Sequence, residues 1–314
     1  PGDLERLTYD TKTQWPDAGK MPAGFDPQQQ LIEGMDPGLG LRQLQQQGIT
    51  GKGIRVAMID KYILPDHVEL AGHIKYTLVD PLNVAGSTPH FHGMATASIL
   101  AGSNLGVAPD AFLYYYAVPD WRPDGFTNYV KALEQIVQMN STLPMAERIR
   151  VVSVSWAPDA NKEPDTARKW DDLVAQAKTQ GTAVVYAHET PVAAFGTAGV
   201  LPGRDRNDPN AYEWADWVLR GNGDRTRLNK SSLGVPASFR TTASVAGPKE
   251  YAYWGDSGQS WAIPYFAGLV TLGLQVNPDM SLDDLYVALE RTAEPNAQGI
   301  RMVNPAAFIA AVRR

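Results

Sequence analysis

The sequence predicts an α/β protein, a three-layer αβα sandwich whose central sheet is mostly parallel. Short runs rich in β-branched residues alternate along the chain with amphipathic stretches of helical length. This alternation is typical of βαβ units, which build a parallel sheet covered by helices on both faces. The 314 residues are 44% hydrophobic and 20% charged, which are ordinary values for a globular protein with a sizeable core.

The predicted elements follow one another in a regular order. Apolar runs predict buried strands at residues 54–59, 111–118, 151–155 and 183–187. Amphipathic stretches predict helices at residues 93–101, 127–139, 166–180, 260–275 and 281–292. Leu39, Leu41 and Leu44 predict a short earlier helix that stops at Gly48. The last helix opens with a Ser that is followed three residues later by an acidic residue, a near match to a capping box.

Two segments interrupt this order. Residues 1–37 are rich in Pro, Gly, Asp and Gln without a sustained period, and we interpret them as an N-terminal arm lying on the main domain of residues 38–314. Residues 190–234 hold many Gly, Asp, Asn and Arg, with one expected helix around residues 211–219. We interpret them as an insertion, because so long a connection in a compact domain is usually functional or partly disordered.

Bulk properties argue against several classes of function. The net charge of −6 and a pI near 5.4 disfavour a nucleic-acid partner. No run of about 18 apolar residues exists, so no transmembrane helix is expected. The absence of cysteine excludes disulfides, thiolate metal sites and a cysteine nucleophile. A nucleotide-binding domain is disfavoured because no glycine-rich phosphate loop follows the first strand.

Three polar residues lie where the predicted elements begin or end. Asp60 directly follows the first strand, and active sites of parallel sheets lie at the carboxyl ends of their strands. His92 opens one helix, and Ser260 begins another, where backbone N–H groups favour developing negative charge. A serine hydroxyl becomes a nucleophile when an imidazole takes its proton and a carboxylate orients that imidazole. The three residues are therefore candidates for a catalytic triad.

Each of these residues alone has a simpler explanation. An Asp after a strand usually forms a turn, a His before Gly is usually a turn or core residue, and a Ser at a helix start is usually an N-cap. Their combination, in this order along the chain, favours the catalytic interpretation. Of the other histidines, His73 and His90 belong to no motif, and His90 is compatible with a surface position.

The motifs around the three residues resemble those of subtilases, the subtilisin-like serine peptidases, whose triad residues occur in the order Asp, His, Ser. Residues 56–60 look like the family's strand-then-Asp motif, and residues 92–95 look like its His-Gly-Thr-His motif. The family's Gly-Thr-Ser-Met-Ala-x-Pro-x-x-Ala-Gly motif is matched at Gly258, Ser260, Ala262, Pro264, Ala267 and Gly268. Residues 106–109 and 235–238 are familiar connectors, so that the resemblance covers roughly residues 40–312.

The resemblance implies a subtilisin-like fold and a serine endopeptidase. In such an enzyme Ser260 forms an acyl-enzyme, His92 is the general base and Asp60 orients it, and the chemistry requires no cofactor. A protein or peptide substrate, a pro-segment and a secreted or extracytoplasmic location are implied in the same way. His67 resembles the family's structural His after the Asp strand.

The chain departs from the family pattern around the triad and at the oxyanion hole. The departures beside the triad are Lys61, Tyr62, Met94, Ala95, Gln259 and Trp261. Thr190 takes the position of the oxyanion-hole Asn, and loss of one such donor costs roughly 10²–10³ in turnover. The alternative donors in the insertion are Asn207, Asn210, Asn222 and Asn229. The runner-up function is therefore a catalytically impaired subtilase-like protein that acts as a peptide-binding or regulatory module.

The resemblance also implies a peptide substrate paired between two backbone strands. One strand is expected at Ser155, Trp156 and Ala157, and the other near Gly125. The Trp156 ring either lines a pocket or packs under the insertion, and the sequence leaves both open. Three acidic residues of the insertion, Asp205, Asp208 and Asp224, offer oxygen ligands for a structural calcium ion, although a solvated acidic loop explains them equally well.

Overall fold

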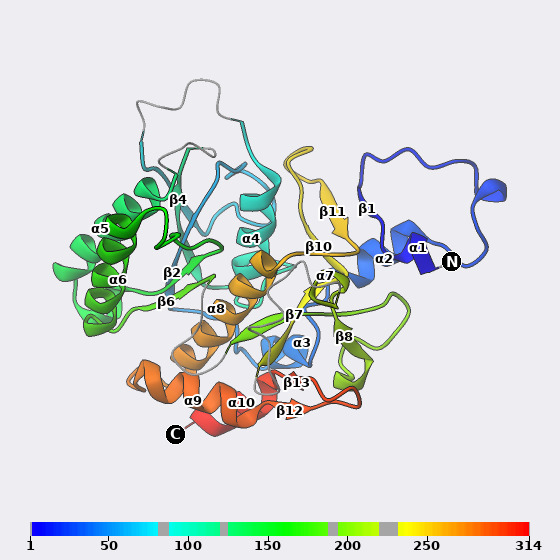
Figure 1. Cartoon of the computed structure of the whole chain (residues 1–314). Coiled ribbons are helices and arrows are strands. Elements are labelled where there is room, and N and C mark those ends of the chain that lie inside the picture. Colours follow the sequence, from blue (N-terminus) through cyan, green and yellow to red (C-terminus); the bar gives the residue numbers. More distant parts are fainter. Residues whose placement is uncertain (1, 81–87, 120–124, 188–193, 220–231, 314) are drawn as a thin grey trace.

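A computed structural model describes residues 2–80, 88–119, 125–187, 194–219 and 232–313, and its centre is a sheet of parallel strands (Figure 1). In spatial order these are β3 (Ile74–Leu78), β4 (Phe112–Ala117), β2 (Arg55–Asp60), β5 (Ile149–Val154) and β6 (Ala183–Tyr186). Every neighbouring pair in this sheet is parallel. The predicted α/β fold with a parallel central sheet is confirmed.

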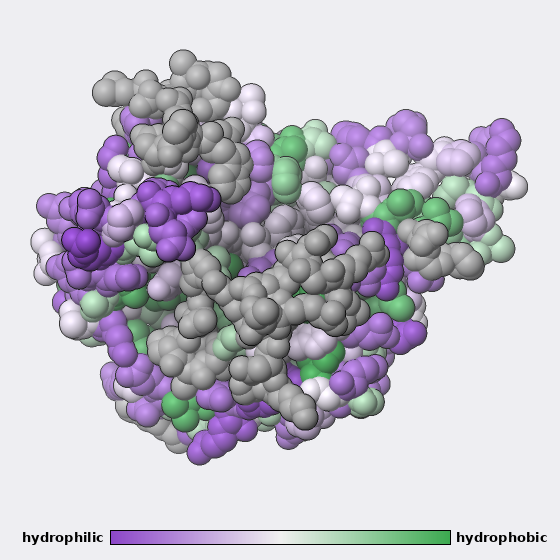
Figure 2. Space-filling view, in the orientation of Figure 1, coloured by the Kyte–Doolittle hydropathy of each residue, from purple (hydrophilic) through white to green (hydrophobic). Residues whose placement is uncertain are grey.

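Different helices cover the two faces of this sheet. They are α4 (Phe91–Ala101) and α8 (Gln259–Val276) on one face, and α5 (Thr127–Ser141) and α6 (Pro164–Thr179) on the other (Figure 1). Along β2, Val56 and Met58 belong to the core under α4 and α8, whereas Ala57 and Ile59 belong to the core under α5 and α6. This alternation is the period of two that a pleated strand imposes. The outer surface of α5 and α6 is mostly hydrophilic in Figure 2, as expected for amphipathic helices.

The sequence predicted the bounds of these central elements accurately. The four predicted strands and five predicted helices differ from the observed ones by at most two residues at either end. The final predicted helix is α9 (Leu282–Thr292), where Ser281 accepts a hydrogen bond from the Asp284 N–H at 3.1 Å. Two further helices are α3 (Leu41–Gln46), predicted from its leucines, and α10 (Pro305–Val312). Among the residues that the structure describes, no helix is both long and apolar enough to cross a membrane.

A second sheet includes much of the expected insertion. Its order is β12 (Glu294–Pro295), β13 (Arg301–Met302), β9 (Leu233–Ser238), β7 (Phe195–Val200) and β8 (Tyr212–Trp214). The expected helix at residues 211–219 is wrong over most of its length, because β8 pairs antiparallel with β7 and only α7 (Asp216–Leu219) is helical. The Tyr212 side chain is fully buried and donates to the Arg206 carbonyl at 2.8 Å, so tertiary packing decides this segment.

The N-terminal segment, described from residue 2 to residue 37, lies along a third, antiparallel sheet. Its strand β1 (Thr8–Asp10) pairs with β11 (Tyr251–Trp254), which in turn pairs with β10 (Arg240–Ala243). The segment also contains the short helices α1 (Gly2–Glu5) and α2 (Pro27–Glu33), the second capped by Asp26. Figure 1 shows it on the far side of β11 from the central sheet.

Candidate active site

The candidate site begins with Asp60, the last residue of β2 in the middle of the central sheet. Its side chain is only 2% exposed, yet both carboxylate oxygens are hydrogen-bonded. Oδ1 accepts from the Lys61 N–H at 2.7 Å, and Oδ2 accepts from the Thr96 hydroxyl at 3.0 Å. The Nδ1 of His92 lies 2.8 Å from Oδ1 and 2.9 Å from Oδ2. A buried carboxylate with this many donors is held ionised and fixed in orientation.

His92 is brought to Asp60 by a close approach of helix α4 to the end of β2. The helix begins beside it, where His90 is the N-cap and its side chain accepts the His92 N–H at 3.1 Å. A Cβ on Gly93 would lie 2.6 Å from the Lys61 carbonyl oxygen and would also collide with the Tyr115 hydroxyl. Gly93 therefore lets the helix start close enough for the imidazole to reach the carboxylate.

The two partners shift each other's pKa in the direction that general-base catalysis uses. Burial by itself raises the pKa of Asp60, but the charge and hydrogen bond of His92, with the bonds from Lys61 and Thr96, lower it below the ordinary 3.8. Burial by itself lowers the pKa of His92, but the charge and hydrogen bond of Asp60 raise it above the ordinary 6.5, against an opposing effect of Lys61. The carboxylate therefore favours the protonated imidazolium that forms when His92 accepts a proton.

Ser260 lies in the first turn of α8, as predicted, and the fold brings that turn against His92. The next residue, Trp261, packs edge-on against the imidazole with ring centroids 5.5 Å apart and an interplanar angle of 85°. Between the described Ser260 and His92 no hydrogen bond is formed. Catalytic hydrogen bonds commonly tighten only when substrate binds, so the absence of this bond does not argue against a nucleophile and its base.

Pro264 explains how the start of α8 is attached to the sheet. It is the sixth residue of the helix, where an N–H would normally donate to the carbonyl of Ser260. Because proline has no N–H, that carbonyl needs another donor, and the Ser155 hydroxyl supplies it at 2.8 Å. This bond ties the Ser260 backbone to the end of β5.

The predicted substrate-binding residues lie on two neighbouring loops at the carboxyl edge of the sheet. Ser155, Trp156 and Ala157 follow β5, and Gly125 precedes the start of α5. The half-buried Trp156 ring packs against Phe126, next to Gly125, at a centroid distance of 5.3 Å. The two loops therefore meet through one aromatic cluster, while their role in holding a substrate stays a prediction.

Lys61 is a buried cation beneath this cluster. Its side chain is 1% exposed, and its ammonium donates to the Pro119 carbonyl at 3.3 Å. The same Nζ lies 5.6 Å from the ring centroids of both Tyr129 and Trp156, a cation–π geometry. The departure from the family pattern at this position thus places a positive charge close to the Asp60–His92 pair.

Sequence reasoning missed Thr96 as a partner of the carboxylate. A signal for it exists, since Thr96 lies four residues after His92 and therefore on the same face of helix α4. Two other described histidines, His67 and His73, make structural contacts. His67 is fully buried and its Nε2 lies 2.9 Å from the Glu250 carbonyl oxygen, and His73 Nε2 lies 2.7 Å from that of Ala101.

The predicted oxyanion-hole and calcium residues fall into two groups. Thr190, Asn222, Asn229 and Asp224 lie outside the described residues. The other two candidate amides are bound elsewhere, since Asn207 Oδ1 accepts from the Gly40 N–H and Asn210 Oδ1 from the Ala297 N–H.

The remaining acidic candidates of the insertion form local turns. Asp205 and Asp208 accept backbone N–H groups two residues further on, at 2.8 and 2.9 Å. Within the described ranges, no three His, Asp or Glu side chains are placed to hold a metal ion. The calcium site, which included Asp224, stays a prediction.

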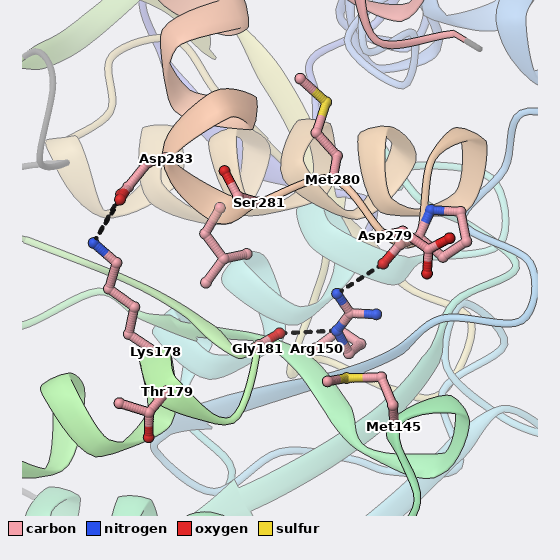
Figure 3. A pocket seen from close by; sticks show the side chains of 11 residues that line it. Met145, Arg150, Lys178, Thr179, Gly181, Asp279, Met280, Ser281 and Asp283 are labelled. Carbon is pink, nitrogen blue, oxygen red and sulfur yellow. Dashed lines mark hydrogen bonds and ion pairs between the residues drawn. The ribbon is translucent and has the colours of Figure 1, made fainter.

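A pocket of about 390 Å³ lies at the opposite edge of the sheet, where β5 and β6 begin (Figure 3). Its charged groups are already paired. Arg150 donates to the carbonyls of Gly181 at 2.8 Å and Pro278 at 3.2 Å, and Lys178 bonds Asp283 at 2.8 and 2.9 Å. This pocket is therefore distinct from the candidate site, which follows the carboxyl ends of the strands.

A family model described as the Subtilase family matches residues 51–305, a range that contains Asp60, His92 and Ser260. The chain belongs to the subtilase family. The serine protease AprX of Bacillus subtilis (strain 168) is 26% identical to this subtilase over 301 residues, which cover 82% of the chain and 66% of AprX. The extracellular serine proteinase of Thermus sp. (strain Rt41A) is 25% identical over 308 residues, with coverages of 94% and 69%. The matches thus span about two thirds of these relatives.

Solved structures show the same fold at low identity. A chain from the subtilase cytotoxin SubAB assembly has a TM-score of 0.60 at 17% identity, and the match covers 88% of this subtilase and 95% of that chain. A cold-adapted subtilisin-like serine proteinase has a TM-score of 0.52 at 18% identity, with coverages of 79% and 84%. The family and the two sequence relatives together support a serine peptidase.

Proposed function

We propose that this subtilase is a serine endopeptidase that hydrolyses peptide bonds through an acyl-enzyme on Ser260. The observation that carries the proposal is the buried pair of Asp60 and His92, bonded at 2.8 and 2.9 Å, with the first turn of α8 packed against its imidazole. A helix start placed beside an oriented imidazole offers a nucleophile, a base and backbone donors in one place.

The chemistry follows the roles that these atoms are able to take. With Nδ1 of His92 bonded to Asp60, Nε2 is the nitrogen that accepts the Ser260 proton as Oγ attacks the substrate carbonyl. The resulting oxyanion is stabilised by the Ser260 N–H at the positive end of α8, with Thr190 as the second donor suggested by its sequence position. The imidazolium then gives its proton to the leaving amine, and a water molecule, activated in the same way, releases the acyl group from Ser260.

A fluorophosphonate probe tests this proposal, because it forms a covalent bond only with an activated serine. Mass spectrometry of the folded protein, freed of any pro-segment, should find the label on Ser260. The label should disappear in Ser260→Ala and His92→Ala and persist in Ser257→Ala, a nearby serine that bonds Ser238 instead. Absence of label from Ser260 in the folded wild-type protein would contradict an acyl-enzyme.

The replacement of the oxyanion-hole Asn by Thr190 favours a second candidate, a catalytically impaired protein that binds extended peptides. Peptide binding measured by calorimetry, in a protein that the probe does not label, would support it. Peptide turnover that Ser260→Ala abolishes would rule it out.

Location and substrate class complete the proposal. The Thermus relative is named an extracellular proteinase, and this supports a secreted or extracytoplasmic protease acting on proteins or peptides after removal of a pro-segment. Fractionation of cells that express the full gene, with immunodetection in the medium, tests the location. Retention of the mature protein in the cytoplasm would contradict it.

A further inference from the structure

Three aromatic side chains form a continuous apolar face beside the imidazole of His92. The edge of Trp261 meets the imidazole, and Trp261 in turn contacts Trp254 with ring centroids 5.3 Å apart. Trp254 then contacts Phe91, also at 5.3 Å with the rings tilted by 33°. The three rings come from α8, β11 and α4, so the face exists only in the folded protein.

The outer part of this face is open to solvent. Trp261 is 5% exposed and belongs to the core, whereas Phe91 is 43% exposed although it directly precedes His92. An aromatic ring contributes little to folding when it stays this exposed, and packing alone does not account for it. The same ring lies 4.5 Å from the ring of His90, which caps the helix.

The face is held in place before any ligand arrives. The backbone of Trp254 is paired on both sides, with Thr8 of β1 and Arg240 of β10. Its indole N–H donates to the Thr242 hydroxyl at 2.8 Å, which fixes the ring. Rigid aromatic residues with one open face are typical anchors of peptide recognition, because little conformational entropy is lost when they bind.

The position of the face relates it to one half of a substrate. In the proposed mechanism His92 hands its proton to the leaving amine, so the leaving half of the peptide passes the imidazole. Trp261 belongs to the core on the α4–α8 side of the sheet, whereas Trp156 packs against the core on the α5–α6 side. The two aromatic groups therefore lie on opposite faces of the central sheet, and the one that touches His92 adjoins the leaving half.

We propose that Phe91, Trp254 and Trp261 bind a large apolar side chain, aromatic or branched aliphatic, in the leaving-group half of the substrate. This inference rests on the proposed acyl-enzyme. It assigns to the three rings the selection of the side chain in the leaving-group half, which the triad itself does not select.

Partitioning of the acyl-enzyme between water and added amines measures this half of the site in isolation. A peptide ester acylates Ser260, and glycinamide or phenylalaninamide then competes with water for the acyl group. The wild-type protein should transfer the acyl group to phenylalaninamide at least tenfold more efficiently than to glycinamide. Phe91→Ala should reduce this preference to about threefold or less.

Its matched control is Phe112→Ala, because Phe112 is 39% exposed at the start of β4, on the opposite edge of the sheet. Phe112→Ala should leave the preference unchanged.

Equal transfer to the two amines, or an unchanged preference in Phe91→Ala, would overturn the inference while leaving the acyl-enzyme intact. If no acyl-enzyme forms, calorimetry of peptide binding still tests the aromatic site independently of the proposed acyl-enzyme. The Ser260→Ala variant should bind a tetrapeptide that begins with Phe more tightly than one that begins with Gly, and Phe91→Ala in that background should remove the difference. If the two tetrapeptides bind equally tightly, that result alone overturns the inference.

Discussion

Thr96 is a residue whose replacement tests the electrostatics of the site while leaving the candidate triad in place. Its hydroxyl lies 3.0 Å from Asp60 Oδ2, 3.0 Å from the His92 carbonyl oxygen and 3.2 Å from that of Gly93. The single hydroxyl proton has three acceptors within reach, and the ionised carboxylate is the strongest of them. Thr96→Val removes the donor and nearly keeps the shape of the side chain.

The expected magnitude follows from the burial of the carboxylate. Because Asp60 is 2% exposed, water does not replace the lost donor, and a hydrogen bond to a charged group contributes about 1.5–3 kcal/mol. The free energy of unfolding at neutral pH should fall by that amount. The pKa of Asp60 lies below 3.8 in the folded state, so its stabilisation is present above the unfolded pKa and is lost as pH falls through the folded pKa. The cost of Thr96→Val should therefore shrink in acid.

Urea unfolding at several pH values measures this cost, in a Ser260→Ala background that prevents self-digestion. Thr96→Ser keeps the donor and should recover most of the loss. Thr271→Val is the matched control, because Thr271 is also fully buried but donates to the Ala267 carbonyl at 2.8 Å. Its cost should not depend on the ionisation of Asp60.

With Ser260 intact, Thr96→Val should also lower kcat by about tenfold to hundredfold, the equivalent of 1.5–3 kcal/mol, with little change in KM. The reason is that the substitution weakens the interaction between the carboxylate and the imidazole, which affects the chemical step rather than substrate binding. A loss of stability that is the same at all pH values, equal to that of Thr271→Val, would refute the reasoning.

Three further predictions concern the same site. Because Asp60 raises the pKa of His92, kcat/KM should rise with pH through a midpoint above 6.5. Asp60→Asn should move that midpoint down and lower kcat by about 10⁴-fold. Initial rates measured across pH test both effects. Lys61→Met should move the same midpoint up, since the ammonium lowers the pKa of His92, and an unmoved midpoint would exclude that influence. Gly93→Ala should destabilise the fold by about 1–3 kcal/mol, whereas Gly258→Ala, which has open space and an ordinary φ of −80°, should stay within about 0.5 kcal/mol in thermal unfolding.

The central sheet could be predicted because its signals are local. Buried parallel strands are continuous apolar runs, and the helices between them repeat apolar residues with their own period. The second sheet gives no such signal. All six residues of β7 are buried, yet two of them are glycines, and a Cβ on Gly199 would lie 2.6 Å from the Ser238 side chain. Such a strand can be recognised only together with its neighbour β9, because the close packing of Ser238 requires a glycine at position 199.

The first turn of α8 shows the same limit at the scale of single atoms. The amphipathic pattern predicts the helix at residues 260–275, but it does not show that Pro264 leaves the Ser260 carbonyl in need of a donor from outside the helix. Ser155, 105 residues away along the chain, supplies that donor. A pattern read over a few neighbouring residues contains no information about such a partner.

The sequence by itself determined the order of the strands and helices of the central sheet, the family, and the ends of strand and helix where Asp60, His92 and Ser260 lie. Only the tertiary structure decided that Thr96 and Lys61 surround the acid–base pair with a donor and a charge, and that Phe91, Trp254 and Trp261 line one side of it. The physical reason is the range of the interactions involved. Strands and helix starts are set by a residue's nearest neighbours along the chain, whereas desolvation, charge and ring packing depend on distances in space that arise when separate elements meet.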